Sequence, residues 1–261
     1  MIIEQPAKWL RWLYPKALWR MDETDHAVYL TFDDGPIPES TPYLLKILRE
    51  FDVKATFFVV GDNVRKYPEL YRQILADGHR VGNHTFNHIG STRHSIREYE
   101  ANVRACNEIM ENEELRMKNE ESLRGNEELR MKNEESTLPS SDKSPQKDDA
   151  NSHSSFFIHH SSLNHSSLSK PLFRPPHGWM RPLQYNRLAN KYRIVMWDLV
   201  TRDYSHMLSA FDVVRNVHRY ARNGSIITFH DSLKSIDKLY FALPSCLRFL
   251  KSQGYEFKTF D

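Results

Sequence analysis

The chain has 261 residues, of which 39% are hydrophobic and 27% are charged, and its formal net charge is +2. This length and hydrophobic content suffice for one sizeable core. No basic cluster resembles a nucleic-acid-binding motif, so we expect no nucleic-acid partner. The two cysteines, Cys106 and Cys246, both lie within predicted helices, which favours buried free thiols over a disulfide bond.

Basic residues interrupt every apolar run near the amino terminus, where the sequence contains Lys8, Arg11, Lys16 and Arg20. The sequence therefore predicts no signal peptide and no transmembrane segment, and by default a cytoplasmic location. Residues 9–14, Trp-Leu-Arg-Trp-Leu-Tyr, are both aromatic and basic, which would suit contact with a membrane surface. Packing of this segment against the main domain is the simpler interpretation and the one we prefer.

The first predicted strand ends in two adjacent acids, because residues 28–36 read Val-Tyr-Leu-Thr-Phe-Asp-Asp-Gly-Pro. Successive side chains on a strand point to opposite faces, so Asp33 and Asp34 can reach one site only where the chain turns. Gly35 and Pro36 supply that turn. One carboxylate could then bind a metal while the other handles a proton. The alternative is two solvated acids in a loop.

Helices and strands alternate along the rest of the chain. Apolar periodicity predicts helices over 41–51, 68–76, 96–110, 182–192, 211–221 and 241–252. It predicts strands over 53–60, 80–82, 193–197, 226–229 and 255–260. Such alternation is typical of a parallel sheet covered by helices.

Three further segments place reactive side chains after strand-like runs. His84 and His88 are four residues apart and follow the short run 80–82, so both imidazoles could reach one cation. Arg174 follows an apolar stub and precedes Pro-Pro-His-Gly, where the remaining backbone N–H groups, at His177 and Gly178, are free to face a ligand. The run 225–231 delivers His230. Clustering at strand carboxyl ends favours a barrel.

Residues 111–170 interrupt this pattern with low-complexity sequence. The eleven residues 112–122 recur identically at 126–136, and a Ser/His-rich tract follows at 152–165. Apolar residues are too sparse for a coiled-coil seam, so we predict a solvated partial helix that leads into disorder. A metal-binding role for the His-rich tract is a weaker alternative. Without this insertion the net charge is +6, from 28 basic and 22 acidic residues, which could favour anionic polymers.

These motifs together resemble the polysaccharide deacetylase family, the carbohydrate esterases with NodB homology, in order and spacing from about residue 19 to residue 260. The family motifs TFDDGP and H-S/T-x-x-H stand unaltered at 31–36 and 84–88, and RPPYG appears at 174–178 with histidine in place of tyrosine. The fourth motif, D-x-x-D-W, is poorly matched by Val-Thr-Arg-Asp-Tyr at 200–204. The fifth, L-x-H, reads Thr-Phe-His at 228–230.

The resemblance implies a distorted (β/α)7 barrel in which 1–110 and 171–261 form one catalytic domain. It also implies one divalent metal ion, preferably Zn²⁺, with Co²⁺, Ni²⁺ or Mn²⁺ as alternatives. The implied roles are metal binding by Asp34, His84 and His88, general base catalysis by Asp33, orientation of that base by Arg174, and general acid catalysis by His230. The implied substrate contacts are His177, Gly178, Tyr204 and Thr228.

Two departures from the family pattern bear on these roles. Val200 stands where the family has an aspartate that tunes the catalytic histidine, so His230 would need Asp198 or Asp203 as a substitute. Tyr204 and Thr228 replace residues that line the pocket for the acetyl methyl group. The acyl-group preference therefore remains open.

One carboxylate and two imidazoles leave open coordination positions on a metal such as Zn²⁺, which suits the activation of water for hydrolysis. We predict a metal-dependent hydrolase that removes acetyl groups from N-acetylated sugars of a glycan or peptidoglycan-like polymer. This reaction breaks a carbon–nitrogen bond other than a peptide bond. The alternatives are an O-acetyl esterase of the xylan type and a catalytically silent glycan-binding module.

Overall fold

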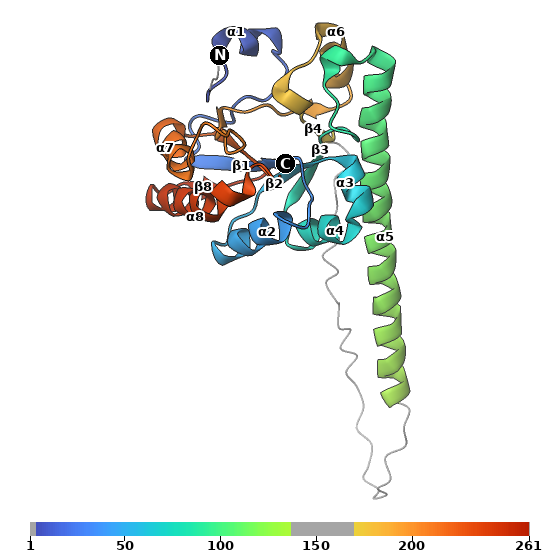
Figure 1. The fold of residues 1–261 in the computed structure, drawn as a ribbon. Coiled ribbons are helices and arrows are strands. Elements are labelled where there is room, and N and C mark those ends of the chain that lie inside the picture. The colour runs from blue at the N-terminus through green and yellow to red at the C-terminus, as the bar shows by residue number, and fades with distance from the viewer. Residues whose placement is uncertain (1–3, 137–169, 261) are drawn as a thin grey trace, which may run out of the picture. The chain divides into compact units, whose positions relative to one another are not determined.

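The computed structural model describes residues 4–136 and 170–260 (Figure 1). The chain divides into two compact units, the first formed by residues 1–115 with 170–261 and the second by residues 116–169. All of the motifs identified above lie in the first unit.

A sheet of eight strands forms the centre of the first unit. The strands are β1 (Ala27–Asp33), β2 (Thr56–Val59), β3 (Arg80–Asn83), β4 (Leu172–Phe173), β5 (Arg193–Ile194), β6 (Leu199–Val200), β7 (Ser225–His230) and β8 (Glu256–Phe257). Their spatial order is β5-β4-β3-β2-β1-β7-β6, with β8 beside β1, and every one of these strand pairs is parallel. The predicted α/β architecture with a parallel sheet is confirmed.

The sheet curls into a distorted barrel, because the two ends of its strand order are neighbours in the chain. Only residues 195–198 separate β5 from β6, and such a linker spans at most about 18 Å. The amino-terminal segment lies in the remaining gap. Leu18 donates its N–H to the carbonyl of Ile194 (2.8 Å) and accepts from the N–H of Met196 (2.7 Å). The N–H of Val200 donates to the carbonyl of Glu4 (2.8 Å).

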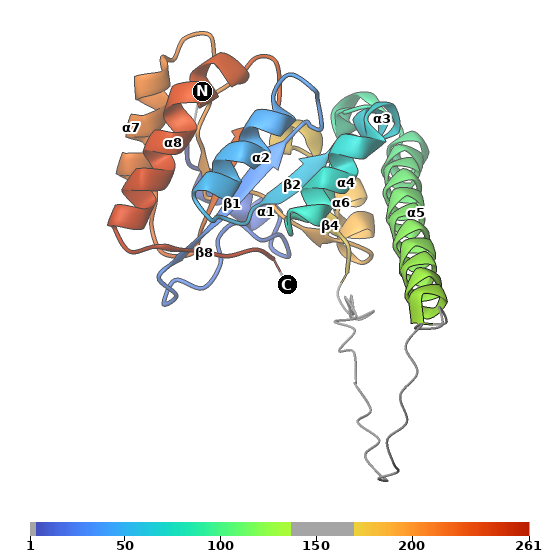
Figure 2. The same cartoon turned by 90° about the horizontal axis from the view of Figure 1, so that it is seen from below.

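Helices cover the outside of this sheet. They are α1 (Lys8–Leu13), α2 (Thr41–Glu50), α3 (Gly61–Lys66), α4 (Pro68–Ala76), α5 (Ile96–Ser136), α6 (Pro182–Ala189), α7 (Ala210–Tyr220) and α8 (Ile236–Ser252), with short 3-10 turns at Ser91–Arg93 and Pro176–Gly178. Figures 1 and 2 show α2, α4, α7 and α8 arranged around the strands. Their inward faces form the largest apolar cluster, which includes Leu44, Ile74, Val213 and Leu243.

Helix α8 begins earlier than the sequence predicts, at Ile236 rather than at residue 241, and it contains Pro244. Proline has no N–H, so the carbonyl of Tyr240 loses its helical donor. The hydroxyl of Tyr43 donates to that carbonyl instead (3.0 Å). Helices α1 and α3 were not predicted, because six residues are too few to show helical periodicity.

The amino-terminal segment packs on the first unit but leaves aromatic surface exposed. Tyr14 is fully buried, and its hydroxyl donates to the carbonyl of Met180 (2.5 Å). Trp9 and Trp12 retain 59% and 84% of their surface exposed. Membrane-surface contact through residues 9–14 therefore stays a prediction. No helix among the described residues is long and apolar enough to cross a bilayer.

Both cysteines are buried and free, as the sequence predicts. Cys106 lies in α5 and Cys246 in α8.

Helix α5 continues past the predicted domain boundary at residue 110. The carboxylate of Glu113 is buried and accepts two hydrogen bonds from the guanidinium of Arg72 (2.9 and 3.0 Å), while Glu114 accepts from the hydroxyl of Tyr71 (2.9 Å). These contacts exist only because the helix extends one further turn. The packed part of the helix therefore reaches about residue 115, where the first unit ends.

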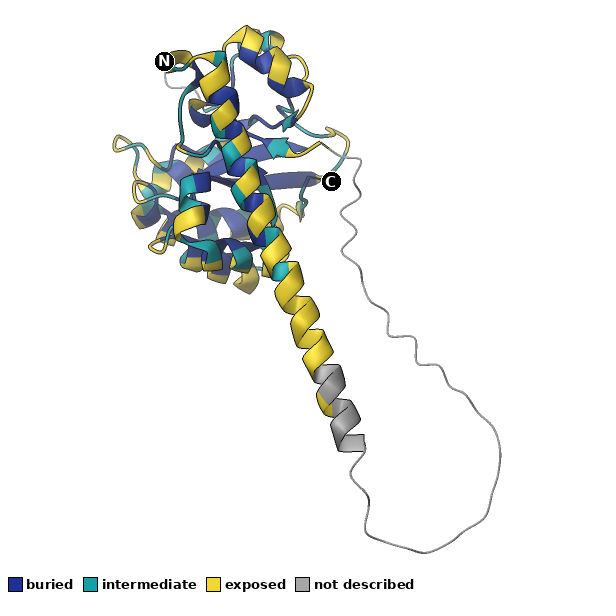
Figure 3. Cartoon of the chain, turned by 90° about the vertical axis from the view of Figure 1, so that its right-hand side faces the viewer, coloured by how far each residue is buried: buried dark blue, intermediate teal, exposed yellow. Residues whose placement is uncertain are grey.

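In the second unit, residues 116–127 are exposed except for Met117, as the exposed colouring of this part of α5 in Figure 3 shows. This agrees with a solvated helix over residues 116–127, whereas the start of the first repeat copy packs on the first unit through Glu113. The predicted disorder beyond residue 136 and the His-rich tract at 152–165 lie outside the described residues.

Candidate active site

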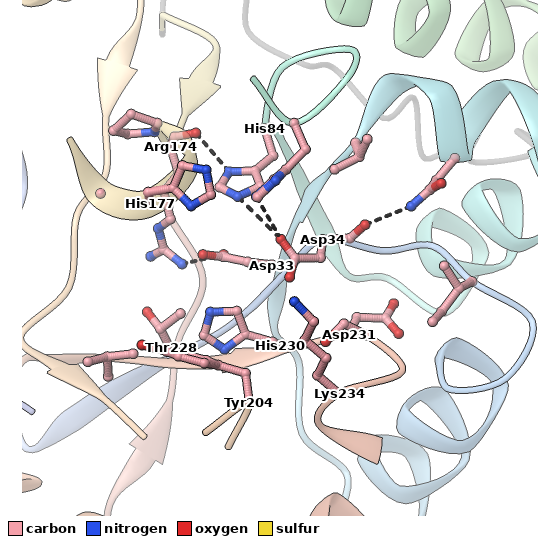
Figure 4. Close-up of a pocket in the computed structure, with 18 of the residues that line it drawn as sticks. Asp33, Asp34, His84, Arg174, His177, Tyr204, Thr228, His230, Asp231 and Lys234 are labelled. Carbon is pink, nitrogen blue, oxygen red and sulfur yellow. Dashed lines mark hydrogen bonds and ion pairs between the residues drawn. The ribbon is translucent and has the colours of Figure 1, made fainter. Parts of the chain in front are cut away.

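The residues predicted from the strand ends come together at one edge of the sheet. Asp33 lies beside His230 in the register of β1 and β7. His84 and Arg174 directly follow the paired ends of β3 and β4. Their side chains converge on one pocket of about 950 Å³ (Figure 4). The carboxyl ends of parallel strands are where such folds place their sites.

Asp34, His84 and His88 bring three ligand atoms into one cluster. Oδ1 of Asp34 lies 3.2 Å from Nε2 of His88 and 3.6 Å from Nε2 of His84. One donor atom from each residue lies within 4.8 Å of the others. In a tetrahedral site with bonds of about 2.0–2.2 Å, neighbouring ligand atoms lie about 3.3–3.6 Å apart. The donor set therefore fits a divalent metal ion.

The protonation states of the cluster also suit a metal. Nδ1 of His84 lies 2.8 Å from the carbonyl of Arg174, which places the ring proton there and leaves Nε2 as the lone-pair atom. Burial lowers the pKa of His84 to about 4, so the ring is neutral at pH 7, as a ligand must be. Burial raises the pKa of Asp34, but the hydrogen bond with His88 and the charge of His230 outweigh burial and hold that pKa below its usual range.

Left-handed backbone conformations are concentrated at the site. Four of the six described non-glycine residues with positive φ are Asp34 (82°), Thr85 (66°), His88 (54°) and His177 (60°). Each costs roughly 1 kcal/mol or more, so the surroundings must enforce it. One such restraint is the side-chain amide of Asn63, which donates to the carbonyl of Asp34 (2.8 Å).

Arg174 fixes the orientation of Asp33. Nη1 of the guanidinium donates to Oδ1 of Asp33 (2.6 Å), and the Nε and Nη2 groups donate to the carbonyls of Val195 and Met196 (3.2 and 2.8 Å). The arginine is only 1% exposed. Since these acceptors and the hydroxyl of Thr31 (2.8 Å) together hold the planar guanidinium, it cannot turn away from the carboxylate.

Asp203 is the carboxylate partner of His230. Its Oδ1 lies 2.8 Å from Nδ1 of the imidazole, and its Oδ2 accepts the backbone N–H of the same histidine (2.7 Å). Asp198, the other candidate for this role, pairs with the guanidinium of Arg222 instead (2.6 Å). Val200 therefore does not deprive the histidine of an acidic partner.

The electrostatic surroundings favour the charged form of His230. Burial lowers its pKa, but the charge and hydrogen bond of Asp203, with the charges of Asp34 and Asp33, outweigh burial and raise it to about 9. The imidazole is therefore protonated at neutral pH. Because Nδ1 is bonded to Asp203, the remaining N–H donor is Nε2.

The turn at Pro176–Gly178 offers one free backbone donor rather than the predicted two. The N–H of Gly178 donates to the carbonyl of Pro175 (3.0 Å), so the expectation that this group faces a ligand is wrong. The N–H of His177 has no hydrogen-bond partner among the described residues. Gly178 has a φ of 64°, and a Cβ added there would lie 1.9 Å from the indole of Trp197, so no larger residue fits.

Tyr204 and Thr228 both line the pocket. The ring of Tyr204 packs edge-on against His230, with 4.7 Å between ring centroids, and remains 40% exposed. Thr228 is buried, and its hydroxyl lies 3.1 Å from that of Thr31, which accepts a hydrogen bond from Arg174. A direct role of these two residues in substrate binding stays a prediction.

Asp231 is a buried acid at the site that sequence reasoning missed. Its carboxylate accepts hydrogen bonds from Ser40 and Thr41, the latter at 2.6 Å, and its N–H donates to the carbonyl of Asp33 (2.7 Å). A Cβ added at Gly35 would lie 2.0 Å from the Asp231 carboxylate. Asp231 therefore fixes the turn that follows Asp33 against the start of α2. The only available signal was its position next to His230.

The fold is a parallel α/β barrel, and its strand ends carry an Asp-His-His cluster, an arginine-bound carboxylate and a charged imidazole. This combination defines a class of metal-dependent hydrolase. A model of the polysaccharide deacetylase family matches residues 20–117. A peptidoglycan-N-acetylglucosamine deacetylase from Bacillus cereus is 28% identical over 245 residues, covering 92% of this chain and 89% of that protein. The chain is thus similar to members of the polysaccharide deacetylase family, the carbohydrate esterases with NodB homology.

Two further similarities are partial or limited to the fold. A chitooligosaccharide deacetylase from Azorhizobium caulinodans is 39% identical over 92 residues, which are 35% of this chain and 44% of that protein. The crystal structure of the Bc1960 peptidoglycan N-acetylglucosamine deacetylase superposes with a TM-score of 0.70 at 24% identity, covering 97% of this chain and 94% of that one. The fold predicted from the motifs is confirmed by this likeness.

Proposed function

We propose that this protein is a metal-dependent N-deacetylase that removes acetyl groups from N-acetylated sugars of a polysaccharide or peptidoglycan-like glycan. The observation that carries the proposal is the joint placement, in one pocket, of an oriented carboxylate and a protonated imidazole beside the Asp-His-His cluster. The relatives named as deacetylases of peptidoglycan and of chitooligosaccharides support the same class of substrate.

Asp33 would act as the general base. Oδ1 accepts the hydrogen bond from Arg174, which leaves Oδ2 to take a proton from the attacking water. Because Arg174 is itself held by backbone carbonyls, the carboxylate keeps one orientation while the substrate binds. This preorganisation avoids reorientation of the base during the reaction.

His230 would act as the general acid. An amine anion is too basic to leave, so cleavage of an amide requires protonation of the leaving nitrogen. The raised pKa of about 9 keeps the proton on the imidazole at neutral pH, and Asp203 holds Nδ1 so that Nε2 is the donating atom. The intact pair of Asp203 and His230 favours amide hydrolysis over the alternatives of ester hydrolysis and silent glycan binding.

Asp34, His84 and His88 would hold the metal, which we propose to be Zn²⁺, with Co²⁺, Ni²⁺ and Mn²⁺ as alternatives. When bound, the ion would supply a Lewis acid near the acetyl carbonyl and increase the acidity of a neighbouring water molecule. The free N–H of His177 would donate to the carbonyl oxygen as negative charge develops on it. Gly178, Tyr204 and Thr228 would shape the pocket around the acetylated sugar.

The decisive experiment combines metal analysis with acetate release. Purified protein would be assayed with N-acetyl-chitooligosaccharides and with acetylated xylan, before and after treatment with a chelator and after readdition of each metal. We expect acetate from the N-acetylated substrate, its loss on chelation and its return with one stoichiometric metal. Asp33→Asn serves as the matched control, because it should keep the metal and lose the activity.

Two results would redirect the proposal. Acetate release from acetylated xylan alone would identify an O-acetyl esterase. Glycan binding without acetate release from either substrate, in protein with full metal occupancy, would identify a silent binding module.

A further inference from the structure

One charged side chain that lines the pocket has no partner among the residues that the structure describes. The other charged groups of the lining are matched: Asp33 with Arg174, Asp34 with His84 and His88, Asp62 with Arg65 and Lys66, Arg202 with Glu4, His230 with Asp203, and Asp231 with the hydroxyls of Ser40 and Thr41. Across residues 4–136 and 170–260, nothing forms a hydrogen bond or an ion pair with the ammonium group of Lys234. This cation is therefore available to a ligand.

The backbone beneath Lys234 is well placed for such a contact. The residue lies in the loop between β7 and α8, four positions after His230. The loop is a hydrogen-bonded turn, in which the N–H of Ser235 donates to the carbonyl of Ser232 (3.0 Å). Figure 4 shows the Lys234 side chain reaching into the pocket toward Asp34 and His230. Its charge therefore lies beside the place where the acetylated sugar would bind.

The chemistry of this group favours a carboxylate ligand. An ammonium group is a compact point charge with three N–H donors, and it forms a charge-assisted hydrogen bond with a single carboxylate. The two arginines that line the pocket, Arg174 and Arg202, are already paired with acids of the protein. A phosphate group would favour several free cations or a bidentate arginine, which this pocket does not offer among its described residues.

We propose that Lys234 binds a carboxylate on the glycan next to the N-acetyl group under attack, and that it thereby selects acidic glycans over neutral ones. Suitable substrates are N-acetylated sugar chains with an ether-linked lactyl group or a uronic acid. The inference rests on the proposed deacetylase function and names the substrate feature that the same pocket recognises.

The test compares two tetrasaccharides of equal length. One is neutral tetra-N-acetyl-chitotetraose, and the other is a peptide-free tetrasaccharide in which alternate N-acetylated sugars carry a 3-O-lactyl carboxylate. Lys234→Gln removes the charge, and Lys234→Arg retains it. Lys251→Gln removes a lysine charge at the far end of α8, about 22 Å along the helix, and serves as the matched control.

We expect Lys234→Gln to raise KM for the acidic tetrasaccharide about 10-fold with little change in kcat, as for the loss of one charge-assisted hydrogen bond. The ratio of kcat/KM between acidic and neutral substrates should fall by the same factor. Lys234→Arg should keep most of the wild-type ratio, and Lys251→Gln should leave the ratio at the wild-type value. Added salt should raise KM for the acidic substrate in the wild type and much less in Lys234→Gln.

An equal effect of Lys234→Gln on both tetrasaccharides, or no effect on the acidic one, would overturn the inference while leaving the deacetylase function intact. Inhibition by inorganic phosphate that depends on Lys234, without inhibition by lactate, would overturn the carboxylate assignment. Absence of acetate release from both substrates by the wild type would instead count against the deacetylase function itself.

Discussion

The proposed metal ligands and the proposed acid–base pairs line the same pocket, yet the chain builds the two sets differently. The three cluster ligands come from two short segments, 33–36 and 84–88, each of which is complete in the sequence. The acid–base groups depend on distant partners: Asp33 and Arg174 are 141 positions apart, and Asp203 and His230 are 27 apart. The proposed metal ligands can therefore be recognised within short segments of sequence. The protonation states of the proposed acid and base depend instead on contacts that form only in the folded barrel.

This difference predicts which substitutions affect metal and which affect only turnover. A change within the cluster should remove both, because the ion and the reaction depend on the same atoms. A change in either acid–base pair should leave the ion in place and alter rate or pH dependence. The following experiments test that separation, from the largest expected effect to the smallest.

Substitution His84→Ala should remove bound metal and activity together. The imidazole supplies one of three ligand atoms. Its Nδ1 donates a hydrogen bond to the carbonyl of Arg174, so Nε2 carries the free lone pair. Metal content measured by elemental analysis and acetate release should fall in parallel. His206→Ala, at an exposed position that does not line the pocket, is the control. Full metal occupancy in a variant that lacks Asp34, His84 and His88 together would refute the ligand assignment.

Substitution Asp33→Asn should lower kcat by about 10² to 10⁴ while the metal remains bound. Asparagine keeps the shape and a hydrogen bond to Arg174 but cannot accept the proton from water. Metal content and kcat are the two measurements. If Asp33→Asn lost the ion and Asp34→Asn kept it, the roles of the two acids would be reversed.

Substitution His230→Ala should reduce N-deacetylation far more than hydrolysis of an activated aryl acetate. The aryl oxide leaves without a proton, whereas the sugar amine needs one. Rates on both substrates, measured with the same enzyme preparation, give the comparison. Equal losses on the two substrates would show that His230 is not the acid.

Substitution Asp203→Asn should shift the basic limb of the pH–rate profile toward lower pH. Burial lowers the pKa of His230 and the Asp203 carboxylate raises it, so without that charge the balance moves toward the neutral imidazole. The wild-type acid is lost as pH rises through about 9. Val200→Asp, which adds an acid where the family motif has one, is the comparison and should move the limb toward higher pH, by a smaller amount. An unchanged limb in Asp203→Asn would contradict this pairing.

The same pair links stability to pH. Because the folded pKa of His230 is raised from 6.5 to about 9, its contribution to stability is complete below about pH 6.5 and is lost as pH rises through 9. Thermal unfolding between pH 6 and pH 10 should therefore show a smaller decline in Asp203→Asn than in the wild type.

Residues 116–169 could be replaced by flexible Gly/Ser linkers of two lengths. Of all the changes considered, this one should alter activity and stability least. The motifs lie outside this segment, and residues 116–127 are exposed except for Met117. Extending the deletion to 111–170 should lower the free energy of unfolding by about 1–3 kcal/mol, because it removes the Glu113 carboxylate that Arg72 binds. Unfolding midpoints of the two deletions provide the measurement. Loss of activity in the shorter deletion with both linkers would show that residues 116–169 serve the site.

The comparison also explains which features of the site could be predicted from the sequence. Five site residues stand at the ends of strand-like runs, and parallel strands bring their carboxyl ends together: Asp33, Asp34, His84, Arg174 and His230. Asp203 could not be chosen over Asp198, because both lie near the poorly matched fourth motif and only packing separates them. Asp198 lies beside Arg222, whereas Asp203 lies beside His230.

The sequence alone determined the alternation of strands and helices, the order of the motifs and the chemical types of the site residues, since these depend on neighbours in the chain. Only the tertiary structure decided the extension of α5 to meet Arg72, the pairing of Asp203 with His230, and the unpaired state of Lys234. Each of these depends on whether a polar group finds a partner across the fold. Burial without a partner is costly, so such pairing is settled by the packing of distant segments rather than by local sequence.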